Sequence, residues 1–168
     1  EGYFADYPPG YLYVLGAVGA VQKIFGLDFD GAAFKMLLAL VPAVCDCAAA
    51  WLVAQLGQRC LPDGRGVLCL TAFAAFHPAA LFDTAVWKQI DGAFTLPILL
   101  CFLLLETKNY LPAAIFYGVA LAIKPQALLF GPVLAACFLA GIVLEQDRLR
   151  AFGRCFVGAA LAVLPVLA

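Results

Sequence analysis

Long apolar stretches, separated by short polar segments, follow one another along the whole chain. They cover residues 11–27, 32–57, 67–82, 93–105, 110–123, 125–144 and 151–168. A helix that crosses a bilayer needs about 20 apolar residues. The stretches 32–57 and 125–144 reach that length, and 67–82 reaches it with a modest extension. The pattern predicts an all-α protein built from transmembrane helices.

Two of the apolar stretches, 93–105 and 110–123, are short for an ordinary crossing. We expect them to be untilted, re-entrant or buried between neighbouring helices. The predicted architecture is a polytopic transmembrane helical bundle with some short or re-entrant helices. The chain begins at Glu1 in a polar, aromatic segment and ends inside an apolar stretch. We therefore expect residues 1–168 to be part of one transmembrane domain that continues on both sides.

Composition supports a membrane location. Hydrophobic residues make up 65% of the chain and charged residues 12%, against about 25% charged in soluble domains. The net charge of −1 gives no indication of a nucleic-acid partner. The seven cysteines lack CxxC spacing, and Cys45 and Cys47 would point to different faces of a helix. We expect buried free thiols and assign no metal ligands.

Charge in the loops bears on orientation. The segment 145–154 carries Arg148, Arg150 and Arg154, which places it in the cytoplasm by the positive-inside rule. Lys23 and Lys35 place the segment 27–32 on the same side. Strict alternation of all the stretches would put these two segments on opposite sides. One short stretch, or the break at residues 124–125, is therefore not a boundary between two full crossings.

The first polar motif, Asp6-Tyr7-Pro8-Pro9-Gly10-Tyr11, precedes the first apolar stretch. Two prolines fit the end of a loop or the first turn of a helix. They would hold Asp6 near the water interface, beside tyrosines of an aromatic belt. Taken alone, the motif is explained somewhat better by a helix start with a carboxylate near the positive end of its dipole.

Asp46 lies in the middle of the stretch 32–57, far in sequence from any other charge. An unpaired carboxylate at mid-membrane costs about 2.5–3.5 kcal/mol, so Asp46 requires a partner. That partner is either a group on another helix, in a purely structural pair, or a substrate.

The densest polar group stands between two apolar stretches and contains His77, Asp83, Lys88, Gln89 and Asp91. Ionisable groups inside a membrane usually face a bundle interior or an aqueous cavity. The number of polar groups therefore favours a functional site over a charged loop with a snorkelling lysine.

Local geometry can be predicted for this group. In one continuous helix, Asp83, Trp87 and Asp91 would share a stripe, with Thr84 and Lys88 on the adjacent stripe. His77 precedes a proline and is expected at a bend.

The last motif, Lys124-Pro125-Gln126, interrupts a long apolar run. Pro125 is expected to break the helix there. Lys124 either binds a phosphate as a point charge or anchors a helix end at the interface.

Taken in order, these motifs resemble the GT-C superfamily of polytopic glycosyltransferases. The likeness covers residues 4–132 and is nearest to bacterial relatives of the GPI mannosyltransferases. It rests on Asp-Tyr-Pro-Pro at 6–9, the central Asp46, the series from Pro78 to Asp91, and Lys-Pro-Gln at 124–126.

The resemblance implies an inverting transfer of a hexose from a polyprenyl-phosphate carrier to a glycan or lipid acceptor. Mannose is the expected hexose. The reaction would take place on the extracytoplasmic face of a bacterial inner membrane. In such enzymes a loop carboxylate acts as general base, usually upstream of the Asp-Tyr-Pro-Pro motif. Asp6 is therefore the catalytic candidate within this chain, although the base itself is expected before Glu1.

The resemblance assigns the remaining candidates to substrate binding. It implies no resident cofactor and leaves a requirement for a divalent metal open. The substrate-binding candidates are Tyr7, Tyr11, Asp46, His77, Asp83, Trp87, Lys88, Gln89, Asp91, Lys124 and Gln126.

Two alternatives remain at this level. Broken helices, Asp46 and Lys124 also suit the midplane site of a transporter or flippase for a lipid-linked or anionic substrate. A membrane scaffold without catalytic function is the third hypothesis. It would tolerate alanine at Asp6, Asp83 and Asp91.

Overall fold

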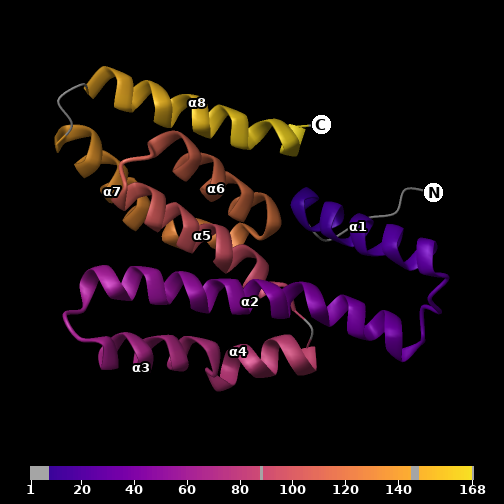
Figure 1. Cartoon of the computed structure of the whole chain (residues 1–168). Coiled ribbons are helices and arrows are strands. Elements are labelled where there is room, and N and C mark those ends of the chain that lie inside the picture. Colours follow the sequence, from indigo (N-terminus) through magenta and orange to yellow (C-terminus); the bar gives the residue numbers. More distant parts are fainter. Residues whose placement is uncertain (1–7, 88, 145–147, 168) are drawn as a thin grey trace. The chain divides into compact units, whose positions relative to one another are not determined.

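The computed structural model describes residues 8–87, 89–144 and 148–167, and these residues contain helices and connecting segments but no strand. The prediction of an all-α protein is confirmed. The elements in chain order are α1 Pro9–Phe25, α2 Ala32–Cys60, α3 Gly64–Ala75, α4 Pro78–Phe82, the π-helix η1 Asp83–Trp87, α5 Asp91–Glu106, α6 Tyr110–Ile123, the 3₁₀-helix η2 Pro125–Phe130, α7 Gly131–Leu144 and α8 Arg148–Leu167 (Figure 1).

Three helical segments are long and apolar enough to cross a bilayer: Ala32–Cys60, Gly64–Trp87 and Pro125–Val143. They correspond to the three stretches predicted to span the membrane. Only 6% to 22% of their most apolar windows is buried inside the protein. Most of their apolar side chains therefore face outward. Such a large exposed apolar surface fits contact with lipid and is not found on helices that face water.

The chain forms two compact units, and each is described by itself. The middle unit is Leu15–Leu99, and the terminal unit combines Glu1–Val14 with Leu100–Ala168. In the middle unit, α2 and α3 form a hairpin (Figure 1). Gly57 lies in this contact, where an added Cβ would be in ordinary van der Waals contact, at 3.4 Å, with the side chain of Leu70. Asp63 caps α3 by accepting a 2.8 Å hydrogen bond from the Gly66 N–H.

A bend separates α3 from α4. His77 has a ψ of 122° and lies between the two helices, and Pro78 opens α4. The predicted bend at His77 is confirmed. Its physical cause is the proline ring, which disfavours helical geometry at the preceding residue. The bend redirects the chain into η1, where the polar group begins.

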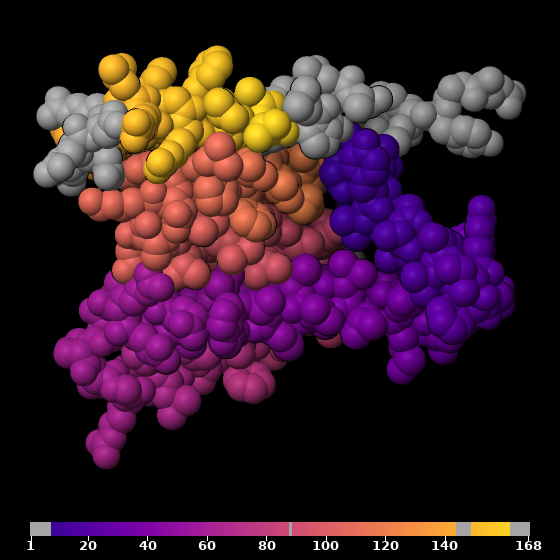
Figure 2. All heavy atoms as spheres, turned by 45° about the horizontal axis from the view of Figure 1, so that its top comes forward, coloured from indigo at the N-terminus to yellow at the C-terminus, as the bar shows by residue number. Residues whose placement is uncertain are grey.

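In the terminal unit, glycines of α7 and α8 lie against residues of α6. A Cβ on Gly141 of α7 would lie 2.8 Å from the Tyr110 ring, and one on Gly158 of α8 would lie 2.6 Å from the Leu111 carbonyl oxygen. Small residues at such contacts are typical of helix packing in membranes. Figure 2 shows the yellow side chains of α8 against the salmon atoms of α6. Cys101, Ala113 and Leu134 are fully buried in the core of this unit.

Two further predictions concern the terminal unit. Lys124 is extended (φ −149°, ψ 119°) between α6 and η2, so the predicted break there is confirmed. Residues 148–154, which were expected to belong to a polar loop over 145–154, are helical, because α8 begins at Arg148. Arginine is a good helix former, and its charge alone does not prevent helix formation.

Candidate functional site

Asp46 finds its partner on η1. The Thr84 hydroxyl donates a 2.5 Å hydrogen bond to Oδ2 of Asp46. A hydrogen bond to a charged group contributes about 1.5–3 kcal/mol, roughly twice that of a neutral pair. The partner that a mid-membrane carboxylate requires is therefore, within the described residues, a neutral hydroxyl of the same unit.

Gly92 lies directly against the same carboxylate. A Cβ added to Gly92 would overlap Oδ1 of Asp46 and would lie 3.0 Å from the Pro42 carbonyl oxygen. The position thus admits only glycine, and the first turn of α5 can approach α2 only because no side chain intervenes. Asp46 therefore contacts both η1 and α5.

The segment Asp83–Trp87 forms a π-helix of five residues. The Gln89 N–H donates a 3.1 Å hydrogen bond to the Asp83 carbonyl oxygen beyond its end. Single π-turns of this kind are rare and are frequent at functional sites.

This geometry corrects the expected stripe of one continuous helix. Asp83 and Trp87 belong to η1, whereas Asp91 begins α5 after an irregular connection. The wider π-turn changes the angle per residue, so i, i+4 and i+8 no longer coincide.

Asp83, Trp87 and Asp91 nevertheless meet, because the chain turns and brings them to one cavity. It has a volume of about 420 Å³, and Ala79, Ala80 and Phe82 complete its lining. The Phe82 ring contacts Trp87 edge to face at 5.4 Å. Trp87 itself is 65% exposed. We call this space the aromatic–acidic cavity.

A smaller cavity of about 180 Å³ adjoins it. Ala80, Asp83 and Asp91 border both spaces. Asp46, Thr84 and Thr95 line only the smaller one. Thr95 donates its hydroxyl to the Asp91 carbonyl oxygen at 2.8 Å. Asp46 and Thr84 thus lie behind the aromatic–acidic cavity.

Two candidates of the same segment lie elsewhere. The His77 ring packs edge to face on Phe73 at 5.0 Å, and His77 is not among the residues that line either cavity. Gln89 is exposed after the end of η1 and lines neither cavity. The structure therefore brings together Asp46, Asp83, Trp87 and Asp91 from the predicted set.

The terminal unit joins two other motifs. A Cβ on Gly10 would lie 2.5 Å from the Ala122 carbonyl oxygen, so the start of α1 touches the end of α6. Tyr11 and Lys124, both partly buried, are each within two residues of this contact. Gln126 is exposed on η2. Asp6, Tyr7 and Lys88 lie outside the described residues.

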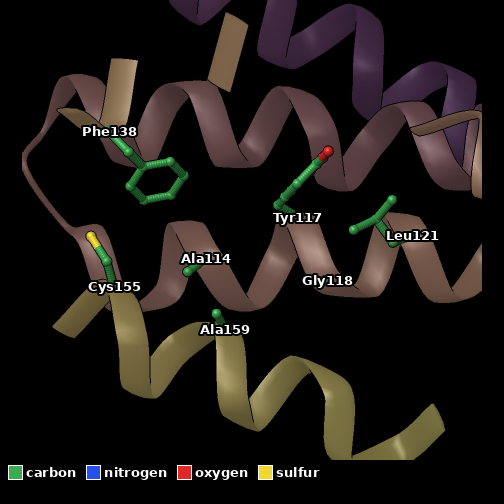
Figure 3. Close-up of a pocket in the computed structure, with 7 residues that line it drawn as sticks. All are labelled: Ala114, Tyr117, Gly118, Leu121, Phe138, Cys155 and Ala159. Carbon is green, nitrogen blue, oxygen red and sulfur yellow. The ribbon is translucent and has the colours of Figure 1, made fainter. Parts of the chain in front are cut away.

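An apolar cavity of about 310 Å³ opens in the terminal unit between α6 and its neighbours. Tyr117 and Leu121 rise into it from α6, Phe138 reaches it from α7, and Cys155 and Ala159 face it from α8 (Figure 3). The Tyr117 hydroxyl donates a 3.4 Å hydrogen bond to the Ala127 carbonyl oxygen. The chemistry of this lining suits a hydrocarbon group.

Metal ligation has no candidate set in the part of the chain that the structure describes. Groups of three or more His, Cys, Asp or Glu side chains within reach of one ion are absent there. Thr84 and Gly92 belong to the site but were not among the predicted site residues. Their one signal was their position, each directly after a predicted site carboxylate.

Comparison with known proteins places the chain in a family. Residues 4–168 match glycosyltransferase family 87. No curated protein and no solved structure matches the chain. The match covers nearly the whole chain and agrees with its helices of membrane-spanning length. The chain therefore belongs to glycosyltransferase family 87 and is a membrane protein.

Proposed function

We propose that this glycosyltransferase moves a hexose from a polyprenyl-phosphate carrier to a glycan or lipid acceptor. Mannose is the hexose that we propose ahead of the others. The acceptor hydroxyl oxygen attacks the anomeric carbon, and the bond from that carbon to the phosphate oxygen breaks. The polyprenyl phosphate leaves with the bonding electron pair, and the hydroxyl proton passes to a carboxylate base. Attack from the face opposite the phosphate inverts the anomeric configuration.

The observation that carries the proposal is the aromatic–acidic cavity. A pyranose has an apolar C–H face and a rim of hydroxyl groups. The exposed indole of Trp87 offers a flat apolar surface, and Asp83 and Asp91 beside it offer acceptors for hydroxyl groups. The volume of about 420 Å³ lies within the range typical of small-molecule sites.

The carrier needs partners for its phosphate and its tail. Lys124 and Lys88 are the candidates for the phosphate, since an ammonium group binds a phosphate as a point charge. Tyr7, Tyr11 and Gln126 are candidates near the donor. The terminal unit also holds the apolar cavity at Tyr117 and Phe138, whose lining suits a hydrocarbon chain.

The base is proposed to be a carboxylate of the loop preceding Asp6, with Asp6 as the candidate inside the chain. The proposed setting is the extracytoplasmic face of a bacterial inner membrane. The arginines at 148, 150 and 154 support this orientation, because basic segments are retained on the cytoplasmic side.

The test uses the full-length protein in liposomes with radiolabelled polyprenyl-phosphate mannose or glucose and extracted bacterial lipids and glycans as acceptors. We expect transfer of label from one of these donors, and an inverted product by NMR. Transfer from a nucleotide sugar alone would reject the proposed carrier. Absence of transfer from every lipid-linked sugar tried would reject it as well.

Transport of a lipid-linked substrate is the second candidate function. The helix breaks at His77 and Lys124 favour it, because discontinuous helices often form transporter sites. Movement of the donor across proteoliposomes in the absence of any acceptor would support this function.

A further inference from the structure

We infer that Asp46, Thr84 and Gly92 are positioning residues, which hold η1 and α5 in place and thereby present Trp87, Asp83 and Asp91 to the sugar. This inference rests on the proposed function, in which the aromatic–acidic cavity binds the sugar. Asp46 and Thr84 border only the smaller space behind that cavity. Asp46 therefore acts through its neighbours and does not contact the sugar.

The first connection is between α2 and η1. The 2.5 Å hydrogen bond joins Asp46 to Thr84 across 38 residues of sequence. Thr84 follows Asp83 directly, and Trp87 ends the same π-helix. A π-helix is a rare conformation that a chain adopts when other contacts hold it. The bond from Thr84 supplies one such contact.

The second connection is between α2 and α5. The Asp46 carboxylate lies against Gly92, in the first turn of α5. Negative charge is favourable at the first turn of a helix, because the peptide dipoles leave that end positive. The same carboxylate thus orients the helix that carries Asp91, and one side chain sets the spacing of both walls of the cavity.

The connections also account for a charged residue in an apolar helix. A mid-membrane carboxylate costs about 2.5–3.5 kcal/mol on insertion. Serine or asparagine at position 46 would reduce that cost but would bind Thr84 more weakly. An apolar residue at position 46 could pack α2 against its neighbours without that cost. We infer that the Asp46 carboxylate instead serves to hold the sugar-facing residues in a fixed position.

The test uses the full-length protein in which Trp51, and any tryptophan outside residues 1–168, is replaced by phenylalanine, so that Trp87 is the single tryptophan. Trp51 lies on α2 and lines neither of the two cavities. In this background Thr84→Val removes the hydroxyl, and Thr84→Ser restores it. Asp46→Asn keeps an acceptor oxygen without the charge. Thr71→Val is the matched control, because the Thr71 hydroxyl bonds the Val67 carbonyl oxygen of its own helix.

Two readouts are compared. We expect Thr84→Val to shift the emission maximum of Trp87 and to raise the KM for polyprenyl-phosphate mannose or glucose about tenfold. Asp46→Asn should give smaller changes in the same direction. Thr84→Ser and Thr71→Val should match the parent protein in both readouts. Size-exclusion chromatography and Tm in detergent check that each variant is folded.

The emission readout does not depend on transfer. If the parent protein transfers no sugar, the proposed function fails, and the Trp87 spectra still decide whether Thr84 positions η1. If Thr84→Val and Asp46→Asn give the spectrum and KM of Thr71→Val, the positioning role is rejected. If Thr84→Val does not fold, Asp46→Asn against Thr71→Val provides the same comparison.

Discussion

The Thr84 hydroxyl donates a 2.5 Å hydrogen bond to the carboxylate of Asp46 and joins α2 to the π-helix η1. The two side chains lie behind the cavity that Trp87, Asp83 and Asp91 line. A partner requirement predicted from the cost of a membrane-embedded charge is thus met by a neutral group next to the site.

The coupling between these two residues is measurable in stability. We expect Asp46→Ala and Thr84→Val to destabilise the protein singly, and the double variant to lose less than the sum. The coupling should be about 1–2 kcal/mol, because each single variant already removes the same bond. Unfolding in mixed detergent micelles gives the free energy of unfolding of the parent protein, the two single variants and the double variant, which together form the double-mutant cycle. Additive effects would show that the two side chains do not interact in the folded protein.

Gly92 provides a steric test. Gly92→Ala places a methyl group onto the Asp46 carboxylate, and we expect a loss of about 1–3 kcal/mol. The matched control is Gly16→Ala in α1, where a Cβ meets nothing within 4 Å. Alanine there should be neutral or stabilise the helix by up to about 1 kcal/mol. Equal unfolding free energies for both variants would contradict the close approach at Gly92.

Trp87 and Trp51 have nearly equal exposure, 65% and 61%, which makes them a matched pair. We expect Trp87→Ala to raise the KM for the lipid-linked sugar about tenfold, since it removes the flat surface of the cavity. Trp87→Phe should retain part of the affinity, and Trp51→Ala should have little effect. Initial rates over a range of donor concentrations give the values. A larger effect at Trp51 would place the sugar outside the aromatic–acidic cavity.

Lys124 is tested as a phosphate ligand. Lys124→Gln should weaken donor binding about tenfold, because a neutral amide lacks the charge that strengthens a bond to phosphate. Lys35→Gln, at an exposed lysine of α2, is the control. Polyprenyl phosphate without a sugar competes with the donor. Its inhibition constant therefore measures the contribution of the phosphate and the lipid tail to binding, without that of the sugar. An unchanged inhibition constant in Lys124→Gln would assign Lys124 to anchoring at the membrane interface.

Much of the fold follows from local chemistry. Apolar length predicted where helices lie, and proline placed the break at Lys124 and the bend at His77 with no knowledge of neighbours. The stripe of Asp83, Trp87 and Asp91 could not be predicted correctly. A π-turn differs from an α-turn by one residue in hydrogen-bond spacing, and contacts remote in sequence decide between them.

The sequence by itself determined that this protein is helical and membrane-embedded, and that Asp46 requires a partner. These properties depend on the free energy of single residues in an apolar medium, which does not change with the fold. Only the tertiary structure decided that Thr84 is the partner, that Gly92 must lack a side chain, and that Asp83, Trp87 and Asp91 share a cavity. Each of these relationships joins helices through contacts of a few ångströms, and residue type alone does not encode which helices meet.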